Sequence, residues 1–173
     1  MRKLGIVGGT SWSSTALYYE HINRGVARRL GALHSARLAI ESLDLASVAA
    51  MELSDDWDGV AAVLIEAARK LKSSGAEGVL LASNTSHKVY DRVKAAVRLP
   101  MLHIADATAE QLVADKHSRV ALIGTRFTMT EGHIRDRLEA RGKVILAVGA
   151  QPHDPLTGEP VHRQTPQQIV DQI

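Results

Sequence analysis

The chain contains 173 residues, 45% of them hydrophobic, which is enough for one domain, or for one complete domain and part of another, with a substantial core. The net charge is +2, the Lys and Arg residues are dispersed, and aromatic residues make up only 3%. This composition argues against the basic, base-stacking face of a nucleic-acid-binding protein. The absence of cysteine excludes disulfides, a thiolate metal site and a thiol nucleophile.

The start of the chain predicts a location. The apolar run after Met1-Arg2-Lys3 ends at Gly8-Gly9 and is too short for a signal peptide, and no apolar stretch approaches the length of a membrane span. We therefore expect a cytoplasmic protein that does not bind membranes.

The first half of the chain predicts strands that alternate with helices. In order, we expect a strand over 3–7, a tight turn at Gly8-Gly9-Thr10-Ser11, a helix from Ser13 or Ser14 to Gly31, a strand over 38–43, a short helix over 45–53 capped by Asp44, and a helix from Asp55 or Asp56 to Gly75. The last helix carries an apolar stripe that we assign to the core, formed by Val60, Val63, Leu64, Ala67 and Leu71.

The second half continues the alternation. We expect a strand over 79–82, a helix from 88 to 97 that Pro100 ends, a strand over 101–104, a helix over 105–116, a strand over 120–123, a helix over 129–141 and a strand over 144–148. Repeated units of this length predict a parallel sheet with right-handed crossovers. The predicted fold class is therefore α/β: a three-layer, parallel-sheet domain over 1–98, a second, incomplete domain of the same type over 99–150, and a loop with a terminal helix over 151–173.

A site is expected where the strand over 79–82 ends. Its four apolar residues show no polar alternation, which is typical of a strand buried on both faces, and Ser83, Asn84, Thr85 and His87 follow it. Ligands of such sheets bind beyond the carboxyl ends of the strands. The hydroxyl and amide side chains, together with the backbone N–H groups of the helix that begins next, predict a site for a small anionic ligand. A second polar strand end follows at Gly124-Thr125-Arg126-Phe127-Thr128.

Two other kinds of site are less favoured. Gly5, Gly8 and Gly9 do not match the G-x-G-x-x-G spacing of a dinucleotide site, so a close-packed turn is the preferred interpretation of the Gly8-Gly9 pair. The eight histidines include no pair four residues apart beside a Glu, and we expect no metal site. His21 and His103 are interpreted as packing or supporting groups.

Several motifs, in order and in register over residues 3–141, resemble the aspartate/glutamate racemase family. They are Leu4-Gly5-Ile6-Val7-Gly8-Gly9-Thr10-Ser11-Trp12 with Ser14-Thr15 and Tyr18-Tyr19, Ser83-Asn84-Thr85-Ser86-His87-Lys88, His103-Ile104-Ala105-Asp106-Ala107-Thr108, and Gly124-Thr125-Arg126-Phe127-Thr128-Met129. The resemblance implies two similar α/β domains that face each other across a cleft. It also implies cofactor-independent racemisation of acidic amino acids by two opposed acid/base residues, in a protein that forms a homodimer.

The resemblance also implies roles for individual residues. Ser83 occupies the position of the family's first acid/base residue, which is usually a Cys. Separately from the resemblance, the place of His87 three residues after Asn84 suggests a supporting residue that could reach the same pocket and activate the Ser83 hydroxyl. The expected ligands of the substrate are Thr10, Ser11, Asn84, Thr85, Thr125 and Thr128. No Lys or Arg is uniquely placed to receive the distal carboxylate of aspartate or glutamate.

The chain departs from the family pattern in its last part. The family carries a second Cys in a Gly-Cys-Thr-Glu stretch, which this sequence lacks. From about Ala150 we expect no resemblance to the family, and we expect a truncated second domain. Three interpretations stay open: a racemase or epimerase for aspartate or glutamate, a catalytically inactive relative that binds an acidic amino acid, and a truncated product that is stable only as a dimer. For single residues, Ser83, Thr125 and Thr128 could instead be simple helix caps.

Overall fold

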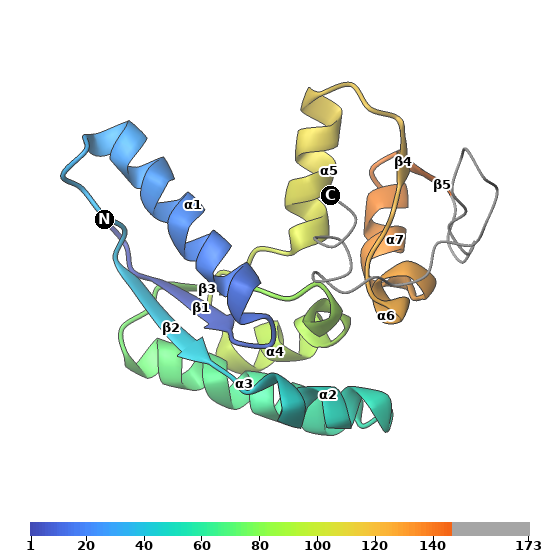
Figure 1. Ribbon diagram of the computed structural model, residues 1–173, viewed down its shortest axis with the longest axis horizontal. Coiled ribbons are helices and arrows are strands. Elements are labelled where there is room, and N and C mark those ends of the chain that lie inside the picture. Colours follow the sequence, from blue (N-terminus) through green and yellow to red (C-terminus); the bar gives the residue numbers. More distant parts are fainter. Residues whose placement is uncertain (147–173) are drawn as a thin grey trace, which may run out of the picture.

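The computed structural model describes residues 1–146, and for the last strand it describes only the backbone. Two parallel sheets and the helices around them make up this part of the chain (Figure 1). The elements are β1 (Leu4–Gly8), α1 (Trp12–Leu30), β2 (Leu38–Ser42), α2 (Leu45–Leu53), α3 (Trp57–Ser73), β3 (Gly78–Leu81), the short 3-10 helix η1 (Thr85–Val89), α4 (Tyr90–Val97), α5 (Ile104–Ala114), β4 (Arg119–Ala121), α6 (Arg126–Thr130), α7 (Gly132–Glu139) and β5 (Val144–Leu146).

The first sheet has the strand order β2-β1-β3 and is entirely parallel, with Leu4 of β1 opposite Leu38 and Gly78. Helix α1 lies on one side of it and helices α2, α3 and α4 lie on the other, so this region has three layers (Figure 1). The predicted α/β class with a parallel first sheet is confirmed. All carboxyl ends of these strands meet at one edge of the sheet, which is where the polar segments after β1 and β3 begin.

The core of this region lies between the sheet and α3. Val60, Leu64, Ala67 and Leu71 are at most 2% exposed, as the predicted apolar stripe requires, whereas Val63 is only half-buried. They pack against strand residues such as Val79 and Leu81. Burial of this stripe is the main force that fixes α3 on the sheet and so fixes the strand ends.

The second region contains the two-stranded parallel sheet β4-β5 with α5, α6 and α7. Its small core is formed by Ala105 and Ala109 of α5 and by Ile134 and Leu138 of α7. A parallel sheet with helices is present here, as expected, but the division of the chain into domains over 1–98 and 99–150 stays a prediction. The loop and helix expected over 151–173 lie outside the described residues.

Three local predictions differ from the structure. The strand expected over 101–104 is reduced to one bridge between Met101 and Val79, because the His103 ring accepts a hydrogen bond from the Ala105 N–H and starts α5 early. The helix expected over 129–141 is two helices, broken at the extended residue Glu131. The cap of α1 is Ser11 rather than Ser13 or Ser14. Asp44 and Asp56 cap α2 and α3 as predicted.

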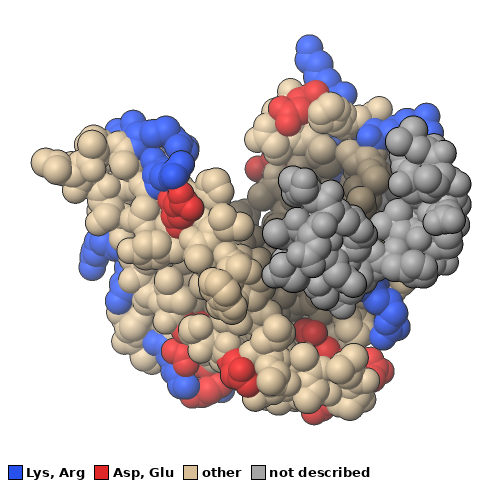
Figure 2. Space-filling model, viewed as in Figure 1, with Lys and Arg blue, Asp and Glu red and all other residues tan. Residues whose placement is uncertain are grey.

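Charged residues are scattered over the surface rather than gathered into a basic face on the side seen in Figure 2. Among residues 1–146, none of the helices combines the length and the apolar character that crossing a bilayer requires.

The turn after β1 gives a direct test of the packing at the strand ends. Gly9 and Gly75 both have a φ of +86°, but a Cβ added at Gly9 would collide with the backbone of Leu43, whereas one at Gly75 would meet open space. We expect Gly75→Ala to lower the free energy of unfolding by about 1 kcal/mol, because only the left-handed backbone is strained, and Gly9→Ala to lower it clearly more. Urea unfolding followed by circular dichroism measures both values. Equal losses would contradict the close approach of the two strand ends.

Candidate active site

A cavity of about 470 Å3 lies at the carboxyl edge of the first sheet, between the first and second regions. Seven of the residues expected from the sequence line it: Thr10, Ser11, Ser83, Asn84, Thr85, Thr125 and Thr128. Another cavity, of about 440 Å3, lies at the opposite edge near Leu4, Gly78 and Leu102, and its lining is mostly apolar. Because the cavity at the carboxyl edge gathers convergent polar groups where α/β sheets bind ligands, we take it as the candidate site.

The turn after β1 forms one wall of this cavity. The N–H of Gly9 donates to the hydroxyl of Thr15 at 3.0 Å, and the side chain of Thr15 fills the space next to Gly8. This is the close-packed strand-to-helix turn expected from the sequence. It leaves Thr10 and Ser11 at the cavity, with Ser11 also capping α1 by accepting from the Ser14 N–H at 3.2 Å.

Three threonine hydroxyls form a chain of contacts across the cavity floor. The hydroxyl of Thr85, on η1, lies 2.9 Å from that of Thr125, which in turn lies 3.1 Å from that of Thr128. Thr125 also caps α6 by accepting from the Thr128 N–H at 3.3 Å, so the capping interpretation holds for Thr125 and does not exclude a place in the site. The cluster offers rotatable O–H donors from two regions of the chain to one ligand group.

Ser83 and Asn84 lie between β3 and η1. Ser83 is half-buried and Asn84 is exposed, and neither side chain hydrogen-bonds to another residue within the described range. The alternative that Ser83 is only a helix cap is therefore not supported, because η1 has no side-chain cap. Both side chains are available to a ligand.

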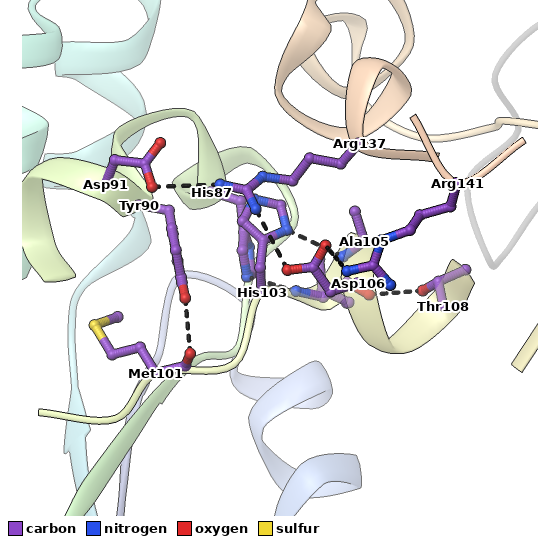
Figure 3. A network of polar contacts seen from close by, with 11 residues as sticks. His87, Tyr90, Asp91, Met101, His103, Ala105, Asp106, Thr108, Arg137 and Arg141 are labelled. Carbon is purple, nitrogen blue, oxygen red and sulfur yellow. Dashed lines mark hydrogen bonds and ion pairs between the residues drawn. The ribbon is translucent and has the colours of Figure 1, made fainter. Parts of the chain in front are cut away.

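His87 does not line the cavity. Its ring is 2% exposed and lies beside that of His103 (Figure 3). Its Nδ1 lies 2.7 Å from the carbonyl oxygen of Ser83, and its Nε2 accepts from the N–H of Ile104 at 3.2 Å. Since a carbonyl only accepts and an N–H only donates, the imidazole is neutral with its proton on Nδ1. His87 thus ties the end of β3 to the start of α5, and it does not reach the Ser83 hydroxyl as the sequence suggested.

The protonation of this buried pair of imidazoles is set by desolvation. Burial lowers the pKa of His87 to about 4, with smaller contributions in the same direction from His133 and Arg137, while the hydrogen bond to Ser83 opposes the shift. Burial also lowers the pKa of His103, whose ring packs edge-on against that of His87, to about 3. Both rings are neutral at pH 7 and act as rigid connectors.

Three polar residues of the lining were missed from the sequence: Ser14 and Tyr18 of α1, and Glu52 of α2. Their spacing carried a signal. Ser11, Ser14 and Tyr18 recur at intervals of three and four residues, as do Leu45, Val48 and Glu52, so each set shares one helix face. Burial raises the pKa of Tyr18 and the pKa of Glu52.

Within residues 1–146, no group of three or more His, Asp or Glu side chains is arranged to hold a metal ion. The cavity instead presents hydroxyls, an amide and one carboxyl, a set suited to hydrogen-bonding a small organic ligand.

Comparison with known proteins identifies the family. A model described as Asp/Glu/Hydantoin racemase matches residues 7–172. The chain belongs to the Asp/Glu/hydantoin racemase family. The match runs beyond Ala150, so the expectation that the resemblance ends there is wrong.

Individual members of the family are similar to this chain over part of their length. The crystal structure of a candidate Asp/Glu racemase from Yersinia pestis is similar to this chain, with 44% sequence identity and a TM-score of 0.79. The crystal structure of an aspartate racemase homologue from Pyrococcus horikoshii OT3 is also similar, with 35% identity and a TM-score of 0.72. Each comparison covers 84% of this chain and 64% of the chain in the crystal structure. The broad specificity amino-acid racemase RacX of Bacillus subtilis is 26% identical over 91 residues, which are 53% of this chain and 40% of RacX. The chain therefore spans 64% or less of these relatives.

The neutral state of His87 predicts a pH dependence of stability. Between pH 6.5 and about 4 the unfolded chain binds a proton at this imidazole and the folded chain does not, so stability should fall as the pH falls through that range. The loss from His87 alone is at most about 3 kcal/mol. In urea unfolding at pH 7 and at about pH 4.5, we expect His87→Gln to be less stable than wild type at pH 7 but to lose less on acidification. An identical pH dependence in both proteins would contradict the assignment.

Proposed function

We propose that this chain catalyses cofactor-independent exchange of the α-proton of an amino acid, as an amino-acid racemase or epimerase, with Ser83 as an acid/base residue. The observation that carries the proposal is the Ser83 hydroxyl, free of hydrogen bonds to the other described residues, in one cavity with Asn84 and the threonine cluster. Family membership supports the reaction class, and the family description supports aspartate or glutamate as the first substrates to test.

The proposed chemistry requires stabilisation of negative charge. Removal of the α-proton leaves a carbanion whose charge spreads onto the α-carboxylate, so donors around that carboxylate lower the barrier. Asn84, Thr85, Thr125 and Thr128 are the proposed donors, and Thr10 and Ser11 complete the site beside them. These groups are held in place by helix caps and strand ends before the substrate arrives, which reduces the reorganisation that the reaction needs.

Ser83 needs help to act as a base, because a hydroxyl is a much weaker acid than the thiol usual at this position in the family. The Ser83 carbonyl is fixed by His87, which holds the residue in place, and the half-buried setting reduces competition from water. We therefore assign His87 a positioning role rather than a role in proton transfer.

Two-way racemisation also needs a second acid/base group on the opposite face of the α-carbon. A second candidate function follows from this requirement: a catalytically inactive relative that binds an acidic amino acid. It is favoured by the hydroxyl at position 83, which is a weaker acid than the thiol usual there in the family. Association into a homodimer stays a prediction.

Proton exchange in deuterated water separates the two candidates. We expect the α-proton signal of the substrate to disappear from the NMR spectrum in the presence of the wild-type chain, and Ser83→Ala to slow this loss by roughly 100-fold or more. Ser83→Cys should accelerate it, because a thiol ionises more readily. Ser35→Ala, which removes an exposed hydroxyl on the loop before β2, is the matched control and should exchange at the wild-type rate.

Binding without exchange in the wild-type chain would favour the inactive relative. Exchange that is unchanged in Ser83→Ala would show that another group removes the proton.

A further inference from the structure

Glu52 is the one charged side chain among the described residues that line the site cavity. The rest of the described lining consists of hydroxyl residues, one amide, small apolar residues and a leucine. A ligand in this cavity therefore meets a single carboxyl group, and no described Lys or Arg of the lining offsets it.

Glu52 is held in the cavity wall by the way α2 packs. Asp44 fixes the start of the helix by accepting from the Ser47 N–H at 3.3 Å, and Val48, 1% exposed, anchors its middle. Glu52 lies one turn after Val48 on the same helix face, and Leu45, one turn before Val48, lines the same cavity. Within the described range, the carboxyl of Glu52 forms no ion pair and no hydrogen bond.

The described residues that line the cavity differ in chemistry between the elements that supply them. Thr85, Thr125 and Thr128, from η1 and α6, supply the hydroxyl cluster proposed above for the α-carboxylate. Tyr18 and Glu52 belong to α1 and α2 and supply a phenol and a carboxyl. If the α-carboxylate of an amino acid binds to the threonine cluster, the amino-acid side chain can contact the groups that α1 and α2 supply.

We propose that Glu52 selects the side chain of the amino acid, favouring a distal group that donates hydrogen bonds, such as a carboxamide, over a distal carboxylate. This inference rests on the proposed function, and it narrows the substrate of the same site. It departs from the acidic side chain that the family description suggests.

The physical reason is that an ionised carboxylate only accepts hydrogen bonds. A carboxamide offers it two N–H donors, whereas a second carboxylate offers none and adds like-charge repulsion in a partly desolvated cavity. Burial raises the pKa of Glu52, which is the response of a carboxyl that lacks a nearby cation. A hydrogen-bond donor on the ligand would reduce the free-energy cost of burying the ionised Glu52 carboxylate, and an anion on the ligand would increase that cost.

The test uses two pairs of amino acids that differ in shape very little. Binding of glutamine and glutamate, and of asparagine and aspartate, is measured by calorimetry on the full chain at neutral pH, and α-proton exchange is followed by NMR in parallel. We expect each amide to bind about tenfold or more tightly than its acid. Glu52→Gln should remove this preference, because the repulsion disappears and the new amide serves donors and acceptors alike.

Glu110→Gln is the matched control, because Glu110 is an exposed carboxylate on α5 that lies outside the lining; the preference should persist in it. A wild-type preference for the acids, or an amide preference unchanged by Glu52→Gln, would overturn the inference. So would a Glu52→Gln variant that binds every amino acid as before but exchanges none, which would make Glu52 an acid/base group. Amide-selective binding without exchange would support the inference while contradicting the proposed catalysis.

Discussion

The hydrogen bond between the hydroxyls of Thr85 and Thr125 is the contact on which the site depends, because it joins the end of the first sheet to the start of α6 across the cavity floor. One neutral hydrogen bond contributes only about 1 kcal/mol, so other contacts must hold the two regions together. Lys88 pairs with Glu131 at 2.7 Å and lies 3.7 Å above the Trp57 ring, which packs edge-on against Phe127. These side chains are partly shielded from water, so together they contribute more to stability than an exposed ion pair does.

A second set of contacts acts at the other end of the same junction. Arg137 of α7 contacts Asp91 of α4 and Asp106 of α5, each at 3.3 Å, and its guanidinium lies 5.4 Å from the centre of the Tyr90 ring (Figure 3). Together with the neutral His87 ring, these contacts fix α5 and α7 against η1 and α4. The described charges of the junction therefore lie outside the cavity, and the part of the cavity lining that the structure describes has hydroxyls, an amide and a single carboxyl.

The elements that could be predicted from the sequence are those that hydrophobic periodicity and capping residues within one segment determine. The strand over 79–82, the stripe on α3 and the caps Asp44 and Asp56 follow from hydrophobic spacing and side-chain chemistry that act within one segment. The strand expected over 101–104 is cut short by the His103 ring, which caps α5, and the break at Glu131 lies at the residue that pairs with Lys88. Hydrophobic periodicity encodes neither contact.

The same distinction applies to the site. The hydroxyl and amide residues that follow β1 and β3 could be placed together because these parallel strands end at one edge of the same sheet. Thr125 and Thr128 follow β4 of the second sheet, and only the resemblance to the family, with its two domains facing a cleft, placed them opposite. Glu52 and Tyr18 enter the site from helix faces, and only the packing of α1 and α2 against the strand ends decides which face turns inward. The partners of His87 were also beyond sequence reasoning, because its spacing after Asn84 does not reveal that both ring nitrogens bind backbone groups.

The central claim is that one amino acid is held simultaneously by the strand end at Ser83-Asn84-Thr85 and by the start of α6. Titration of the isotopically labelled full chain with glutamine, followed through backbone amide signals in NMR, tests it most directly. If both segments hold the same ligand, the backbone amide signals of 83–85 and 125–128 shift together along one binding curve. Shifts confined to one of these segments, or two curves with different midpoints, would contradict a shared site.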